Sequence, residues 1–288
     1  MFIKDFLIKP SLISFYKTEH KYRVLNERYK KEKLIFSETK EFDSKKELKS
    51  YIKEVTEDNP QTYVSTCVLS PNQGVFPSCN KQKYKEAGIE IENIKYICIN
   101  NKYSFYITLY ELMEHKKSYD PDFLYSVLSL MDKKASLKHN ILYALVIKEY
   151  YYFIIYKENI PVFSDIFEVQ EESFEETEEI EDISDLDIVE DFDTALDDNI
   201  ENIEDEEIEK EHPLSTMDIE YKVLEYIKTS LKEYYEGGGD FIEKIIILDT
   251  VGLEKDLTKS VQEELFIDSE IKKFDILKTM NEMSRENV

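Results

Sequence analysis

Strand-like runs of apolar residues dominate the first half of the chain. Each run is short and rich in aromatic or β-branched side chains, which suit the pleated, half-buried surface of a sheet. The runs cover residues 2–8, 12–17, 22–26, 34–37, 63–69, 94–99 and 103–110. The first four follow one another closely, so the sequence predicts an antiparallel meander at the start of the chain.

Three helices are predicted between and after these strands. Ser44 and Glu47 have the spacing of a capping box, and the helix after them has an apolar face made of Leu48, Tyr51, Ile52 and Val55. Asn80 can cap a short helix that Gly88 closes. Asp120-Pro121 predicts a third helix start, with a buried side formed by Leu124, Val127, Leu128 and Met131.

The second half repeats this order of elements. Three strand-like runs joined by tight turns occupy residues 141–148, 150–156 and 160–167. Ser215 and Asp218 then form a capping box for a helix whose apolar stripe is Met217, Tyr221, Leu224, Ile227, Leu231 and Tyr234. The glycine run 237–239 ends that helix. We expect a buried strand at 244–248, a helix marked by Leu253, Leu257, Val261 and Leu265, a strand at 271–276 and a short closing helix.

Both halves therefore run meander, helix, strand, helix, strand, helix. Three antiparallel strands that lead into alternating helices and strands are typical of a ribonuclease-H-like unit. Two such units predict a mixed α/β protein with two ribonuclease-H-like lobes in an actin-like arrangement around a cleft. We expect the first lobe at 1–138, the second at 139–168 and 213–288, and an acidic insert at 169–212. Two unrelated α/β domains would give a similar order.

Three apolar segments carry a resemblance to a known family. They are residues 142–163, residues 223–235, and residues 245–253 with the helix that continues to Leu265. They resemble the second meander, the cleft-crossing helix and the following strand, turn and helix of actin-like cytoplasmic proteins of type IV pilus and type II secretion machines. These proteins are PilM and the cytoplasmic part of the secretion L component. The first half matches them only in the order of its elements.

The chain departs from the ATPases of this fold at their phosphate-binding turns. Those turns contain Asp and glycine, because backbone N–H groups must approach the anion closely, often at positive φ. The corresponding turns here are Ile-Lys-Pro-Ser at 8–11 and Lys-Glu-Tyr at 148–150, and the glycine pair of the adenosine turn is replaced by Asp-Thr-Val-Gly at 249–252. We therefore expect no cofactor and no catalysis, with ATP and magnesium as the alternative.

The formal charge is concentrated in one stretch. Residues 171–211 hold 22 of the 62 acidic residues and one lysine, so they carry −21 of the net −25. Such a block usually stays extended or marginally helical. It repels nucleic acid and anionic membranes, so any partner there is expected to be a basic protein surface.

The insert also contains an apolar stripe. Its members recur mostly every three or four residues, at Phe174, Ile180, Ile183, Leu186, Val189, Phe192, Leu196, Ile200 and Ile203. One interpretation is a solvated tether, and the other is a segment that forms a helix on a partner. If the segment binds, the central residues Ile183, Leu186, Val189 and Phe192 are the expected contacts, since their spacing places them on one helix face.

Isolated reactive side chains offer little catalytic chemistry. The four histidines lie far apart and not at metal spacing, so we expect surface or turn positions for His20, His115, His139 and His212. Asp249 is expected to cap the helix that follows it. The three cysteines, Cys67, Cys79 and Cys98, show no ligand spacing and predict reduced thiols. Together with the absence of an 18-residue apolar run or a signal sequence, this predicts a cytoplasmic protein.

Three functions remain open on this basis. The first is a non-catalytic scaffold at the inner face of the membrane in a pilus, secretion or DNA-uptake machine, where it would bind the cytoplasmic tail of a membrane partner. The second is a nucleotide-binding actin-like ATPase with degenerate phosphate-binding loops. The third is an acidic interaction protein that masks a basic partner. The near neutrality outside 171–211, with 40 acidic residues against 36 basic ones, favours the first over the third.

Overall fold

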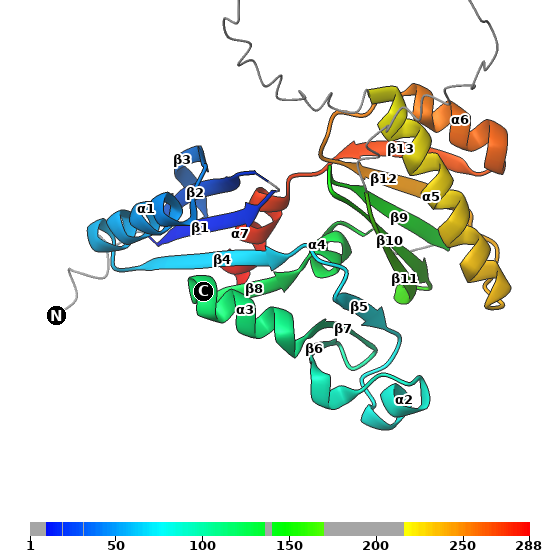
Figure 1. The fold of residues 1–288 in the computed structure, drawn as a ribbon, viewed down its shortest axis with the longest axis horizontal. Helices are drawn as coiled ribbons and strands as arrows, with labels where there is room; N and C mark the ends of the chain where they lie inside the picture. The colour runs from blue at the N-terminus through cyan, green and yellow to red at the C-terminus, as the bar shows by residue number, and fades with distance from the viewer. Residues whose placement is uncertain (1–9, 19, 31, 136–139, 170–215) are drawn as a thin grey trace, which may run out of the picture.

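The computed structural model describes residues 10–18, 20–30, 32–135, 140–169 and 216–288. Two five-stranded sheets and one three-stranded sheet account for its strands. Figure 1 shows one large sheet on each side of the molecule, with the small sheet projecting below the junction between them.

The first large sheet has the strand order β3-β2-β1-β4-β8. Its strands are β1 (Ser11–Lys17), β2 (Tyr22–Lys30), β3 (Lys33–Phe42), β4 (Thr62–Val68) and β8 (Phe123–Ser126). The first three strands are antiparallel, whereas β4 and β8 run parallel to β1. The meander is therefore confirmed at 11–42, and the strand predicted at 2–8 lies outside the described residues.

Helix α1 (Lys45–Asp58) covers one face of this sheet. The predicted capping box is present. The Ser44 hydroxyl accepts a hydrogen bond from the backbone N–H of Glu47, and the Glu47 carboxylate accepts one from the backbone N–H of Ser44. The apolar face of α1 packs on side chains of β1, β2 and β4, and its fully buried contact is Leu48.

The second large sheet repeats the same topology, with the order β11-β10-β9-β12-β13. Its strands are β9 (Ile141–Val146), β10 (Tyr150–Lys157), β11 (Ile160–Glu168), β12 (Lys244–Asp249) and β13 (Asp268–Lys273). Helices α5 (Thr216–Glu236) and α6 (Asp256–Leu265) pack on one face of it. The duplicated order that the sequence predicts is thus confirmed, as is the mixed α/β class.

Helix α5 differs from the prediction at its first turns. Leu224 and Leu231 are each 4% exposed, whereas Met217 and Tyr221 are 81% and 66% exposed. The apolar stripe is therefore buried only in the later turns, where α5 crosses the sheet. The glycine run after Glu236 ends the helix as predicted, with Gly238 at a φ of +82°.

The chain between β4 and β8 forms the small sheet and its helices. The sheet order is β5-β7-β6, made of β5 (Gln73–Phe76), β7 (Tyr103–Thr108) and β6 (Ile94–Ile99). Helix α2 (Lys81–Glu86) has the predicted cap, because the Asn80 side chain accepts a hydrogen bond from the N–H of Gln82. A 3-10 turn, η1 (Ile91–Asn93), leads into β6.

The helix start predicted at Asp120 is wrong. Asp120 is instead the left-handed residue that ends helix α3 (Leu109–Tyr119), and β8 follows before helix α4 (Val127–Lys134) begins. The sequence pattern does not predict α3, and it extends the preceding strand to residue 110. The reason is that α3 buries none of its residues fully, so its apolar pattern is weak.

The C-terminal helix α7 (Ile276–Asn287) crosses to the first sheet. Ser14 of β1 donates a hydrogen bond to the carbonyl oxygen of Leu277 at 2.8 Å, and Asn281 donates one to Glu27 of β2 at 3.0 Å. The predicted strand at 271–276 is therefore wrong at its end, since Asp275 caps α7 by accepting from the N–H of Lys278. The sequence boundaries placed 213–288 with the second lobe, and those boundaries remain a prediction.

The cysteines also differ from expectation. Cys79 and Cys98 form a disulfide that joins the loop before α2 to strand β6, and Cys67 is a buried free thiol. Folding of the small sheet brings the Cα atoms of the pair to 5.6 Å, a proximity that their separation of 19 residues did not indicate.

Candidate functional site

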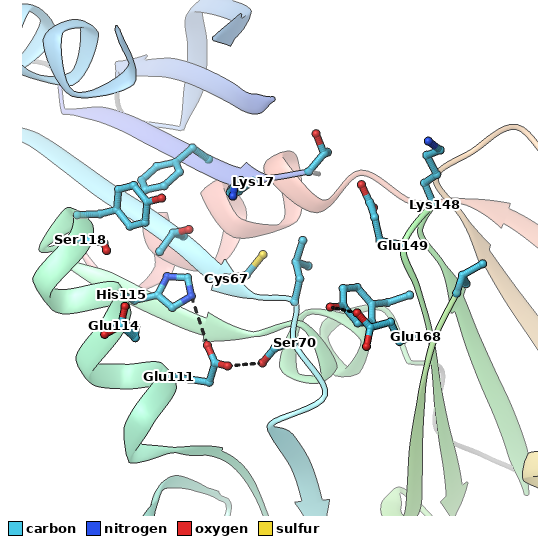
Figure 2. A pocket seen from close by; sticks show the side chains of 17 residues that line it. Lys17, Cys67, Ser70, Glu111, Glu114, His115, Ser118, Lys148, Glu149 and Glu168 are labelled. Carbon is cyan, nitrogen blue, oxygen red and sulfur yellow. Dashed lines mark hydrogen bonds and ion pairs between the residues drawn. The ribbon is translucent and has the colours of Figure 1, made fainter. Parts of the chain in front are cut away.

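A cavity of about 620 Å³ lies where the two lobes meet. Its walls come from both large sheets and from α3, as Figure 2 shows. The first lobe contributes the end of β1, the end of β4 and one face of α3, and the second contributes the turn between β9 and β10 and the end of β11. The cavity therefore lies at the carboxyl ends of β1, β4 and β9, which is the usual position of sites in open α/β sheets.

Two equivalent turns lie on opposite sides of this cavity. The turn after β1 contributes Lys17 and Thr18, and the turn after β9 contributes Lys148 and Glu149. We predicted the first turn at 8–11, and this is wrong, because the β1–β2 turn comprises residues 18–21, where the N–H of Thr18 donates to the carbonyl oxygen of Lys21. Its sequence, Thr-Glu-His-Lys, also lacks Asp and glycine.

Acidic side chains outnumber basic ones around the cavity. Two lysines, Lys17 and Lys148, oppose four glutamates, which are Glu111, Glu114, Glu149 and Glu168. With histidine neutral, the lining therefore has a net charge of −2. A cavity of this charge favours cationic groups and disfavours a polyphosphate.

Glu111 contacts three neighbouring side chains at the cavity wall. Ser70 donates a hydrogen bond to its Oε1 at 2.6 Å, and Asn72 donates to the same oxygen at 3.0 Å. Its Oε2 lies 3.9 Å from Nε2 of His115, one helical turn further along α3. Ser70 thus donates to Glu111 and not to His115, so this trio lacks the hydroxyl–imidazole contact of a hydrolase nucleophile.

His115 is largely buried at the base of this group. Burial lowers the pKa of its imidazole below the usual value, and the charges of Glu111 and Glu114 oppose that effect. The Nδ1 atom is buried and has no hydrogen-bond partner within the part of the chain that the structure describes. The expected surface or turn position for this histidine is therefore wrong.

Tyr150 and Glu168 form the wall on the second lobe. The Tyr150 hydroxyl donates to Glu168 at 3.2 Å, and burial together with this carboxylate raises the pKa of the tyrosine to about 12. Tyr150 is thus a neutral hydrogen-bond donor at physiological pH. Beside it, the N–H of Val169 donates to the carbonyl oxygen of Glu149 and holds the end of β11 against the turn.

A second depression of about 570 Å³ contains Asp249 and Gly252 beside the crossing to α7. Asp249 Oδ1 accepts hydrogen bonds from the N–H groups of Val251 and Gly252, both at 2.8 Å. Asp249 therefore caps its own turn and not α6, whose N-cap position is Lys255. One of its carboxylate oxygens is committed to this turn.

The predicted partner contacts Ile183, Leu186, Val189 and Phe192 lie outside the described residues, as do His139 and His212. His20 is exposed in the β1–β2 turn, as expected, and lines a smaller depression there. The functional candidates that the sequence missed are on α3. A signal was available, because Thr108 and Glu111 have capping-box spacing and Thr108 does accept from the N–H of Glu111.

The described residues contain no group of three or more His, Cys, Asp or Glu side chains placed to hold a metal ion. Within the same residues, no helix is both long and apolar enough to cross a bilayer.

Two family models match the chain. One, described as domain of unknown function DUF8569, matches residues 8–132, and the other, domain of unknown function DUF8341, matches residues 142–288. No curated protein matches the chain.

Several solved structures are similar to this chain. A Bacteroides thetaiotaomicron protein with an actin-like ATPase fold and unknown function is 12% identical over 97% of this chain and 99% of its own, with a TM-score of 0.52. A PilM–PilN type IV pilus biogenesis complex has a chain that is 8% identical over 95% and 94%, with a TM-score of 0.51. The cytoplasmic domain of EpsL, an inner membrane component of the type II secretion system of Vibrio cholerae, is 7% identical over 96% and 95%, with a TM-score of 0.43. The two-lobed actin-like arrangement that the sequence predicts is confirmed.

Proposed function

This chain belongs to the DUF8341 family, a domain of unknown function, and we propose that it is a non-catalytic scaffold that binds a protein partner in the cavity between its lobes. The partner supplies an extended segment with a basic side chain. The observation that carries the proposal is the lining of the cavity, where four glutamates face two lysines and neither phosphate turn contains glycine.

The cavity has the size and chemistry for a short peptide. A volume of about 620 Å³ accommodates a few side chains. A lysine or arginine of the peptide would approach Glu114 and Glu168, the two exposed carboxylates on opposite lobes. The neutral hydroxyls of Ser118 and Tyr150 line the same space and can bond a peptide backbone.

The fold suggests where such a partner would be found. One similar structure is a PilM–PilN complex for type IV pilus biogenesis. That likeness supports our proposal that this chain acts at the cytoplasmic face of an inner-membrane pilus, secretion or DNA-uptake machine, with the cytoplasmic tail of a membrane component as the partner. The cysteines no longer support that location, because the Cys79–Cys98 disulfide is of a kind that is rare in the cytosol.

Nucleotide binding is the second candidate function of this cavity. Lys17 and Lys148 line it from the two turns that hold phosphate in actin-like ATPases, and this placement favours an anionic ligand. The four glutamates of the lining repel such an anion and oppose nucleotide binding.

Calorimetry and membrane capture separate the two candidates. We expect no magnesium-dependent heat when ATP is titrated into the purified chain at millimolar concentration. The chain should retain a membrane protein from detergent-solubilised membranes of its host, and the double variant Glu114→Lys/Glu168→Lys should lose it. Glu54→Lys on α1, an exposed acid outside the cavity, is the matched control. Magnesium-dependent ATP binding, or equal capture by the double variant, would contradict the proposal.

A further inference from the structure

Two exposed phenylalanines lie at the end of the second sheet that is opposite the cavity. Phe241 precedes β12 and is 66% exposed, and Phe266 precedes β13 and is 85% exposed. The strands are parallel neighbours with Lys244 paired to Asp268, so the two phenylalanines leave the sheet at the same end. Figure 1 shows the carboxyl ends of α5 and α6, from which these loops depart, on the side of the second lobe away from the first.

The loop that carries Phe241 is held rigidly. The N–H groups of Gly239 and Asp240 donate to the backbone oxygen and the hydroxyl of Tyr234 at 3.0 and 3.2 Å. The N–H of Ile242 donates to the hydroxyl of Tyr235, and the Asn140 side chain donates to the carbonyl oxygen of Phe241 itself. The backbone around Phe241 is thus fixed while its side chain remains in solvent.

Phe266 occupies a position that usually suits glycine. It is the residue after α6, with a φ of +56°, and its N–H donates to the carbonyl oxygen of Gln262 at 3.0 Å. A left-handed conformation is unfavourable for a bulky residue, and glycine is the common choice at this helix end. The exposed side chain gains little burial in return. Unfavourable backbone geometry of this kind is typical of functional positions.

The surroundings of the two phenylalanines are acidic. Seven acidic residues and one lysine lie within five positions of either, the acids being Glu236, Asp240, Glu243, Glu263, Glu264, Asp268 and Glu270. That lysine, Lys244, is 3.1 Å from Glu270. Four more lysines reach the same region and pair with acids of this set, Lys157 with Asp240, Lys228 with Glu264, Lys232 with Glu236 and Lys272 with Glu270, so five lysines face seven acids. The patch therefore retains an excess of negative charge around two apolar anchors.

We propose that Phe241 and Phe266 form a second protein-binding surface, which takes a partner helix with an apolar face bordered by lysine or arginine. Phenylalanine is enriched in protein interfaces, and a loop whose backbone is already held, like that of Phe241, loses little conformational freedom on binding. The acidic border excludes an anionic membrane or nucleic acid and favours a basic partner. This surface is distinct from the cavity, so its failure would not affect the proposed function.

A model peptide tests the chemistry of the partner. The probe is a synthetic, fluorescently labelled 14-residue helix of lysine and leucine, measured by anisotropy at physiological salt, with a glutamate–leucine helix as the second probe. The wild-type chain should bind only the basic peptide, and Phe241→Ser/Phe266→Ser should weaken that binding by about tenfold or more. The control Tyr221→Ser removes an equally exposed aromatic residue near the other end of α5 and should leave binding unchanged. Equal binding by the double variant, or no binding of the basic peptide to the wild type, would overturn the proposal.

A stability measurement provides an independent check. Because glycine suits the left-handed backbone, Phe266→Gly should raise the melting temperature by about 2 °C while it weakens peptide binding. Opposite effects on stability and binding are expected only if the side chain serves a partner. A fall in melting temperature would show that Phe266 stabilises the fold itself and would refute its assignment as an anchor.

Discussion

Replacing Cys79 and Cys98 with serine should destabilise the small sheet of the first lobe. The disulfide closes a loop with a sequence separation of 19 residues. A loop of this length constrains the unfolded chain by about 3 kcal/mol in the chain-entropy model. The loop contains Tyr84, which is fully buried, with its ring centroid 4.3 Å from that of Phe76 and 5.2 Å from that of Tyr96. Loss of the disulfide should therefore loosen a local aromatic cluster.

Thiol titration and hydrogen exchange can measure this effect. The oxidised chain should show no rapidly reacting thiol, because burial raises the pKa of the Cys67 thiol far above its usual value and shields it. Treatment with dithiothreitol should expose two reactive thiols and speed amide exchange in α2 and β6. The double serine variant should exchange at the faster rate with or without reductant. Two reactive thiols in the chain purified under oxidising conditions, or exchange in α2 and β6 that reduction leaves unchanged, would refute the reasoning.

Three further predictions concern the second lobe, the insert and the cavity. Leu224→Ala and Leu231→Ala should each cost about 2–5 kcal/mol in chemical denaturation, because both side chains are almost fully buried, while Tyr221→Ala should cost little; losses below about 1 kcal/mol at both leucines would contradict the core position of α5. Replacing residues 170–211 with a short Gly/Ser linker should shift the melting temperature by only a few degrees, since sparse apolar residues in an acidic block add little to a core. The free energy of unfolding should fall as the pH drops below about 6.5, the pKa of histidine in the unfolded chain. Burial lowers the pKa of His115 in the folded state, so the unfolded state binds more protons in this range. His115→Gln should therefore reduce the fall in melting temperature between pH 7.5 and 5.5.

The large sheets could be predicted from the sequence because their strands have strong local patterns. All six residues of β9 are buried, and their sequence Ile-Leu-Tyr-Ala-Leu-Val is apolar throughout. The parallel strand β12 has the same character, with Ile245 to Leu248 buried. Such runs need no tertiary information to be recognised. Their repetition in both halves then indicates the duplicated fold.

The cavity could not be predicted in the same way, because its walls come from weak or misplaced elements. Helix α3 supplies Glu111 and His115, yet it packs with one half-buried face and shows no strong periodicity. The first phosphate turn is assigned to residues 8–11 from the sequence, whereas the turn between β1 and β2 lies at 18–21. Residues 2–8 are as apolar as those of β1, so the local pattern does not show which turn joins the two paired strands β1 and β2.

The acidic insert and the cavity are neighbours in the chain, and this proximity has a consequence for binding. Val169, the first residue of the insert, lines the cavity, and the acidic block begins two residues later at 171. A basic tail that enters the cavity would therefore bring its flanking residues close to a block that carries −21 charges. Tethering of this kind raises the effective concentration of the second contact, and its charge contribution weakens as salt screens it. We expect removal of residues 170–211 to weaken capture of the membrane partner at low salt much more than at high salt. An equal loss at both salt concentrations would mean that the apolar stripe, and not the charge, makes the contact.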